Sequence, residues 1–254
     1  MAQTGEMSFW DHLEDLRRCI FRILGVFGVA VVVLFFFKKF LLDSLILSPS
    51  KSDFFLYQLI GADFSMTLVN IEVAAQFLIH IRITLICALI VTFPIIVYEL
   101  WRFVAPALYE NEKKAVRGAF AFASVLFYVG VTVGYALVFP LMLNFFSGYQ
   151  VSPDIPNTFS LTSYISLFTS LVLTFGIVFE FPTGVAVLSS MGIVTREGLS
   201  SYRKHAICVV LILAAVITPS GDPFSLMVVS VPLYFLYEFS ILICRRRVQT
   251  VEEE

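Results

Sequence analysis

Charged residues are scarce in this sequence. Only 14% of its 254 residues are Asp, Glu, Lys or Arg, whereas 59% are hydrophobic. A soluble domain of this length carries about 25% charged residues and less than half apolar ones. The composition therefore excludes an ordinary soluble protein and indicates an integral membrane protein.

Patterns typical of catalysis and metal binding are also lacking. The four cysteines lie singly in or beside apolar stretches, without the spacing of a zinc site or a disulfide framework, and the three histidines are isolated. The sequence contains no GxSxG nucleophile motif and no phosphate-binding loop. We therefore expect no enzymatic activity, no metal and no cofactor. The net charge of −2 gives no basic surplus for nucleic acid.

Long apolar runs dominate what is present. A bilayer core of about 30 Å needs roughly 20 helical residues. Six runs approach or exceed that length, at about 19–42, 74–100, 116–146, 161–191, 206–218 and 224–244. The fifth would reach only about 20 Å, which predicts local thinning of the bilayer. A re-entrant fifth and sixth pair is the alternative.

We expect one six-span, all-helical domain over residues 1–254, with 245–254 as a tail. Residues 1–16 have no apolar run, which predicts that no cleavable signal peptide precedes the first span. Two small-residue pairs, Gly130 with Gly134 and Gly25 with Gly28, predict close helix packing. Prolines in or at the ends of the spans predict bent helices. They are Pro94, Pro140, Pro182, Pro219 and Pro232.

The distribution of basic residues predicts the orientation. Of the 17 lysines and arginines, all except Lys38, Lys39, Lys51 and Arg82 fall on one side if the six runs cross in turn. Because basic residues concentrate on the cytoplasmic side, both termini are expected in the cytoplasm. The outer segment at 43–73 is rich in Phe and Tyr, which predicts a cap at the membrane interface.

Glu180 is the only ionisable residue of the fourth run. An intramembrane carboxylate costs about 2.5–3.5 kcal/mol on insertion scales, so it indicates a functional site. The alternative is a protonated Glu180 that only hydrogen-bonds a neighbouring helix. A secondary transporter or a membrane insertase could also use it as a polar site, although no internal repeat supports the transporter.

A second group of acids lies on the predicted cytoplasmic side. Asp15 precedes the first run, and Glu112 lies in the short segment between the second and third runs. One interpretation is ordinary solvated charge at helix ends. The other is a carboxylate pair on a membrane-surface groove floored by Phe103, which would receive a basic ligand segment.

Several motifs in the sequence are specific enough to compare with a known family. The sequence contains FVAPALY at 103–109 followed by Glu112-Lys-Lys, HLEDLR at 12–17, FP at 139–140, FGIVFEFP at 175–182 and TPSGD at 218–222. Together they resemble the signature of the TatC family, the multispanning receptor subunit of the twin-arginine protein translocase. The likeness extends along almost the whole chain.

This resemblance implies a fold and a function. The fold would be a concave, glove-like bundle of six kinked helices in the cell inner membrane, with both termini cytoplasmic. The function would be binding of twin-arginine signal peptides of folded precursors, followed by export driven by the proton-motive force. The implied partners are the single-span subunits TatA and TatB, in a homo-oligomeric complex with TatB.

The resemblance also assigns residues by position. Asp15, Arg17, Phe103 and Glu112 match the signal-peptide site. Asp15 stands where the family usually has glutamate, and Glu14 beside it is a possible substitute. The resemblance further assigns Glu180 and Thr218 to polar or partner contacts within the membrane, and Pro49 and Asp222 to functional positions outside the cytoplasm.

Overall fold

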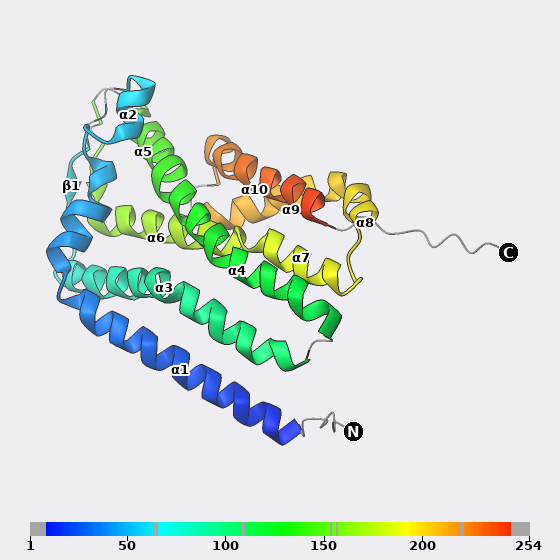
Figure 1. The fold of residues 1–254 in the computed structure, drawn as a ribbon. Coiled ribbons are helices and arrows are strands. Elements are labelled where there is room, and N and C mark those ends of the chain that lie inside the picture. Colours follow the sequence, from blue (N-terminus) through cyan, green and yellow to red (C-terminus); the bar gives the residue numbers. More distant parts are fainter. Residues whose placement is uncertain are drawn as a thin grey trace, which may run out of the picture.

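The computed structural model describes residues 9–62, Phe64, 66–107, 110–152, 154–155, 157–218 and 221–244. Of residues 9, 11, 107 and 110–116 it describes the backbone alone. Over these ranges the chain is almost entirely helical, with one short pair of parallel strands, β1 (Leu68–Val69) and β2 (Phe159–Ser160) (Figure 1). The all-helical class expected from the composition is confirmed.

Five helical stretches in the described residues are long and apolar enough to cross a membrane. They are formed by α1 (Phe9–Phe35), by α3 (Ala75–Val104), by α4 (Glu110–Val133) with η4 (Gly134–Val138) and α5 (Phe139–Gly148), by α6 (Leu161–Val178) with α7 (Phe181–Ser190), and by α10 (Pro223–Ile243). The expected fifth span is α9 (Arg203–Ile217), whose 15 residues reach about 22 Å. A sixth crossing therefore stays a prediction.

The first helix begins well before the first apolar run and ends before that run does. It begins at Phe9, as expected for acids in the first turns of a helix, and it ends at Phe35 instead of continuing to residue 42. A turn at residues 36–37 follows, and the chain then forms a π-helix, η1 (Phe40–Ile46). The apolar run resumes after Lys38 and Lys39, but its last residues fold over the end of the bundle instead of extending the span.

The prolines act in two ways. Pro94 and Pro232 lie inside α3 and α10, where each removes a backbone donor. Pro140 and Pro182 lie in the first turns of α5 and α7, where a missing N–H breaks no helical hydrogen bond. The third and fourth spans are therefore divided into successive helical segments, and Pro219 lies outside the described residues.

The two glycine pairs behave differently. A Cβ atom added at Gly130 would lie 2.5 Å from the carbonyl oxygen of Phe175, and one at Gly134 would lie 3.1 Å from the Cβ of Phe175. The predicted close packing is therefore confirmed where α4 and η4 cross α6. At Gly25 and Gly28 nothing lies within 4 Å, so the prediction is wrong for α1, which packs mainly against α3.

A cap covers the end of the bundle opposite the start of α1 (Figure 1). It comprises η1, η2 (Ser48–Ser50), α2 (Phe55–Ile60) and the strand pair. Tyrosine hydroxyls hold it in place: Tyr164 donates to the carbonyl of Ile46 at 2.6 Å, and Tyr135 donates to that of Leu45 at 2.7 Å. The expected aromatic cap is present, but its rings are largely turned inward.

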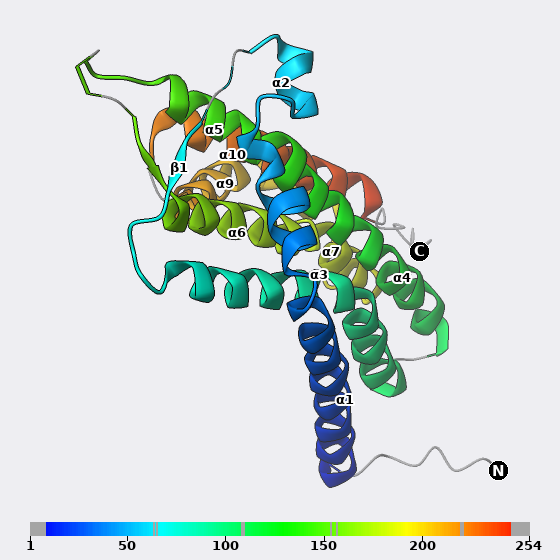
Figure 2. The same ribbon diagram turned by 90° about the vertical axis from the view of Figure 1, so that its left-hand side faces the viewer.

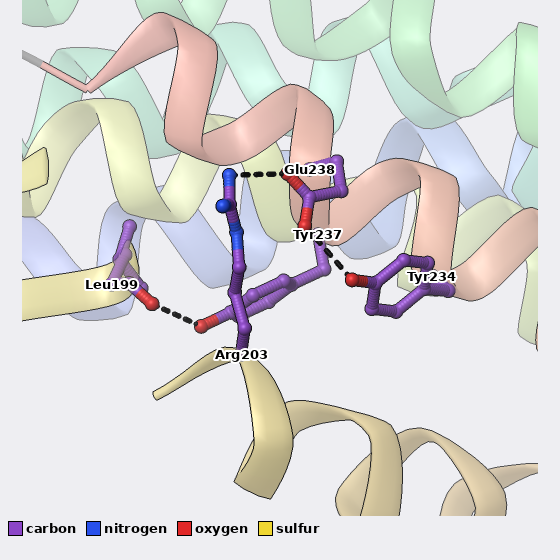
Figure 3. Close-up of polar contacts among 5 residues, drawn as sticks. All are labelled: Leu199, Arg203, Tyr234, Tyr237 and Glu238. Carbon is purple, nitrogen blue, oxygen red and sulfur yellow. Dashed lines mark hydrogen bonds and ion pairs between the residues drawn. The ribbon is translucent and has the colours of Figure 1, made fainter. Parts of the chain in front are cut away.

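The short helix α9 is tied to its neighbours by polar contacts (Figure 3). Arg203 pairs with Glu238 of α10 at 2.9 Å, and Tyr234 donates to the same carboxylate at 2.9 Å. Tyr237 donates to the carbonyl of Leu199 in α8 (Arg196–Ser201) at 2.6 Å. These contacts fix the start of α9 against the last turns of α10.

The helix ends sort into two groups. The start of α1, the end of α3, the start of α4, α8 and the end of α10 lie on one side of the molecule, whereas α2 and β1 lie on the other (Figure 1). The predicted cytoplasmic segments therefore lie at one common end of the bundle.

The glycine contacts generate a prediction about stability. Gly130→Ala forces a methyl group against the backbone of α6, and overpacking of this kind costs about 1–3 kcal/mol. We expect a lower thermal midpoint for the purified protein in detergent. Gly28→Ala is the control, because its methyl group meets open space and alanine favours a helix. Equal midpoints for the two variants would contradict the packing described here.

Candidate functional site

A pocket of about 330 Å³ lies between the start of α1 and the end of α3. Its lining is polar and includes three charged residues of α1, Asp15, Arg18 and Arg22, together with Glu99 and Arg102 of α3. The other lining residues are His12, Cys19, Phe103 and Pro106. The helix pair thus brings Asp15 and Phe103, two of the predicted site residues, into one pocket.

Helical periodicity explains which residues meet there. His12, Asp15, Cys19 and Arg22 recur at intervals of three or four residues, so they share the face of α1 that packs against α3. Arg17 falls outside this series, and its exposed side chain lies 3.8 Å from Glu14 instead of lining the pocket. In Figure 2, α1 runs along the edge of the molecule beside the end of α3.

The sequence analysis missed Glu99. Only 9% of this residue is exposed, and its carboxylate accepts a hydrogen bond from Arg22 at 2.8 Å, across the contact between α1 and α3. Cys19 donates to the backbone carbonyl of Glu99 at 3.5 Å. Glu99 lies at the end of an apolar run, so in the sequence it resembles an ordinary acid at the end of a membrane span. One signal could have indicated the pair: an acidic residue, Glu99, and a basic residue, Arg22, each lie inside an apolar helix.

The structure separates Asp15 from Glu14. Glu14 is engaged by Arg18 at 2.7 Å and by Arg17 at 3.8 Å on the exposed side of α1. Asp15 lines the pocket, and among the described residues its carboxylate has no ion pair. Of the two neighbouring acids, Asp15 is therefore the one placed to accept a cation from outside.

Phe103 is already in contact with another ring. Its ring stacks on His12 with the centroids 4.5 Å apart and an interplanar angle of 22°. One ring face is therefore covered by α1. Because the ring also lines the pocket, an apolar ligand group can contact the remainder of it.

Glu112 and Glu110 lie in the first turn of α4, which begins directly after the end of α3. The side chains of both lie outside the described residues. The backbone alone places these acids at the same end of the bundle as Asp15 (Figure 1). Whether Glu112 and Asp15 bind one ligand stays a prediction.

Glu180 lies at the break between α6 and α7, where it is the residue before the first turn of α7. Among the described residues, one carboxyl oxygen of Glu180 and the hydroxyl of Ser230 are buried without a hydrogen-bond partner, and the buried hydroxyl of Thr183 lies next to the Glu180 carboxylate. Burying an unsatisfied polar group costs about 1–3 kcal/mol. Glu180 precedes α7, Thr183 lies in α7 and Ser230 in α10, and α7 and α10 are in contact.

The remaining predicted residues have structural contacts. Thr218 is buried and donates to the carbonyl of Ala214 at 2.8 Å, so in this conformation its hydroxyl closes the end of α9. Asp222 accepts from the backbone N–H of Ser225 at 2.8 Å and so caps the start of α10. Pro49 is buried in the cap, and its carbonyl accepts from Tyr57 at 2.8 Å. Burial raises the pKa of Tyr57, which keeps this donor protonated.

Comparison with known proteins identifies the family. The sequence model of the family described as Sec-independent protein translocase protein (TatC) matches residues 11–232. The chain belongs to the TatC family. It is 35% identical to the TatC protein of Blattabacterium sp. subsp. Periplaneta americana (strain BPLAN), over 95% of this chain and 96% of that protein. It is 30% identical to TatC of Escherichia coli (strain K12), over 96% and 91% of the two chains.

Solved structures agree with this assignment. The crystal structure of the twin arginine translocase receptor TatC superimposes with a TM-score of 0.74 at 30% identity, covering 91% of this chain and 97% of that one. A second structure, of the same receptor in DDM, gives a TM-score of 0.76 at 30% identity and covers 92% and 99%. The TatC fold is therefore shared along nearly the whole length. The family is described as a protein translocase protein, so the chain belongs to a component of a transport system.

The contact between Arg22 and Glu99 generates a prediction for this TatC chain. Arg22→Gln leaves a nearly buried carboxylate without its counter-ion. Removing one partner of a fully buried pair costs about 3–5 kcal/mol, and because Arg22 is partly exposed we expect about 1–3. The double variant, Arg22→Gln with Glu99→Gln, should recover part of that loss. The measurement is a double-mutant cycle on thermal unfolding in detergent, and strict additivity of the two changes would contradict the pairing.

Proposed function

We propose that this TatC chain is the receptor for twin-arginine signal peptides in the cell inner membrane. Both termini face the cytoplasm, and folded precursors are captured at the end of the bundle that carries Asp15. The single observation that carries the proposal is a pocket carboxylate, Asp15, without an ion pair among the described residues. The solved relatives described as twin arginine translocase receptors support it.

The chemistry of the ligand follows from the carboxylates. A guanidinium presents two parallel N–H donors that a carboxylate accepts together, whereas the ammonium of lysine cannot reproduce this geometry. Asp15 would take one signal arginine and Glu112 the other. Each charge-assisted hydrogen bond contributes about 1.5–3 kcal/mol, so losing one arginine should cost roughly 10- to 100-fold in affinity.

The pocket's own arginines limit this attraction. Arg22 is committed to Glu99 and Arg18 to Glu14, so their charges are largely compensated. Arg102 lines the same pocket, and no described residue pairs with it. An arriving arginine therefore needs more than Asp15 alone, and the acids at the start of α4, Glu110 and Glu112, supply the additional negative charge. Phe103 would pack against the apolar residue that follows the arginine pair.

Neighbouring acids of α1 provide a matched test. Asp15→Asn should lower the affinity of the purified chain for a twin-arginine peptide roughly 10- to 100-fold, because it removes the charged acceptor. Glu14→Gln removes the same formal charge one residue away and leaves the Arg18 charge at the pocket uncompensated, but it removes no acceptor from the pocket, so its effect should be smaller than that of Asp15→Asn. The measurement is peptide binding in detergent, with a twin-lysine peptide as the specificity control.

The contribution of Glu112 to peptide affinity is tested in the same way. Glu112→Gln should also weaken binding while leaving thermal unfolding unchanged. Site-specific crosslinking from position 112 should capture the twin-arginine peptide. Undiminished binding by both Asp15→Asn and Glu112→Gln would overturn the proposed receptor site, and a larger loss for Glu14→Gln than for Asp15→Asn would overturn the choice between the two acids.

The partner contacts form the second part of the proposal. TatA and TatB would associate with a concave, glove-like face of six spans, and the proton-motive force would drive transport. The carboxyl oxygen of Glu180 that has no hydrogen-bond partner among the described residues supports a polar contact for a partner helix within the membrane. Thr218 could contribute only if the end of α9 rearranged, because its hydroxyl is buried against Ala214.

Glu180→Ala tests this contact. We expect loss of TatB association and of export, while the affinity for a twin-arginine peptide at the Asp15 pocket stays within about twofold of the unaltered chain. Thr92→Val is the control, because its buried hydroxyl donates within α3, to the carbonyl of Ala88 at 2.7 Å. If TatB co-purification and export are both unchanged in Glu180→Ala, Glu180 has only a structural role and the proposed partner contact is wrong.

A further inference from the structure

A second pocket, of about 780 Å³, lies between the end of α3 and the start of α4. We call it the α3–α4 pocket. The α3 residues that line it, among them Pro94, Tyr98 and Trp101, lie on a different face from Glu99 and Phe103, which line the Asp15 pocket. The two pockets therefore flank the last turns of α3, and they share Arg102 and Pro106.

Two arginines give this pocket its charge. Arg102 lies in the last turn of α3, Arg117 lies near the start of α4, and both are exposed. Neither guanidinium takes part in an ion pair within the part of the chain that the structure describes. Two guanidinium groups at one pocket match a phosphate, whose oxygens accept their paired N–H donors.

The pocket is not uniformly polar. Pro94 and Arg102 are eight residues apart on α3, so the pocket extends about 12 Å along the helix from its basic end. The deeper wall is formed by Pro94 and Val97 of α3 with Ala121 and Ser124 of α4. A ligand that fills the pocket therefore has an anionic head and an apolar continuation.

The position of the pocket along the spans also favours a ligand with an anionic head and an apolar continuation. Arg102 lies near the end of the apolar part of α3 and Arg117 near the start of the apolar part of α4, so the headgroups of a bilayer that these helices cross would lie near both arginines. Trp101 lies beside Phe120 with ring centroids 5.5 Å apart, and Tyr98 is exposed, as expected for aromatic residues at the interface. Basic pockets between transmembrane helices at this depth bind anionic lipid headgroups.

We propose that the α3–α4 pocket binds one anionic phospholipid, with its phosphate held by Arg102 and Arg117 and an acyl chain against the apolar wall. A zwitterionic lipid fits less well. Its ammonium needs a carboxylate, and the described lining contains none. Free phosphate would satisfy the arginines but would leave the apolar wall unused. This site is separate from the proposed signal-peptide contact at Asp15, and its test requires no peptide.

The test is lipid binding to the purified full-length chain, measured by native mass spectrometry. The probes are phosphatidylglycerol and phosphatidylcholine with identical acyl chains. We expect the unaltered chain to bind one phosphatidylglycerol at least tenfold more tightly than phosphatidylcholine. Arg102→Gln and Arg117→Gln should each reduce that affinity roughly tenfold, and the double variant should bind both lipids equally.

Two further variants distinguish lipid binding in the pocket from a general effect of positive charge. Ala121→Phe fills the apolar wall and keeps both arginines, so it should also weaken phosphatidylglycerol binding. Arg196→Gln removes one positive charge from α8, at the same end of the bundle but outside the pocket, and should leave binding within twofold. Thermal unfolding of each variant establishes that the fold is intact.

Three results would overturn the proposal. The first is an unchanged preference for phosphatidylglycerol in the folded double variant. The second is a loss in Arg196→Gln as large as that in Arg117→Gln, which would indicate a diffuse electrostatic effect. The third is displacement of the lipid by soluble glycerol phosphate at equal concentration, which would make the site a phosphate site and not a lipid site.

Discussion

The proposed receptor pocket depends on one contact, the packing of α1 against α3. The helix α1 has little other support, and its glycines face open space. Arg22 and Glu99 form the ion pair across this interface, and the His12 and Phe103 rings stack across it nearer the start of α1. If α1 moved away from α3, Asp15 and Phe103 would no longer share a pocket. The polar pair therefore positions the site without having to touch the ligand.

The remaining spans obey a different constraint, because a backbone in lipid must satisfy its own hydrogen bonds. The chain meets it by starting new helical segments at Pro140 and Pro182, where the missing N–H breaks no bond. The break before Pro182 places Glu180 at the end of one helix and the beginning of the next. Close contact of Gly130 with α6 fixes these segments against each other. A buried polar atom at such a break is held by rigid surroundings, which suits a contact with a partner helix.

Much of this fold could be predicted from the sequence. Apolar runs are a strong signal when backbone groups must be satisfied internally, so the four long spans after the first follow directly from them. The signal fails where apolar residues do something other than span: residues 40–42 belong to the first run but fold into the cap with residues 43–46. It is also weak for α9, whose start is fixed by Arg203, Glu238 and the nearby tyrosines instead of by length.

The site was less predictable, for a geometrical reason. Composition and motifs selected Asp15 and Phe103, and the structure places both in one pocket. The choice between Glu14 and Asp15 required knowing which face of α1 packs against α3, because adjacent helical residues point about 100° apart. The pairing of Arg22 with Glu99 joins residues 77 positions apart, and no local pattern contains that information.

Arg102 connects the two pockets that flank the end of α3. Its positive charge repels an arginine arriving at Asp15 and attracts a phosphate to the α3–α4 pocket. A phosphate bound to Arg102 would compensate that charge and so reduce the repulsion at Asp15. Binding of the anionic lipid and of the signal peptide would then favour each other, because each strengthens the electrostatic field that the other requires. The receptor site would in this way bind a signal peptide more tightly in a membrane that contains anionic lipid than in detergent alone.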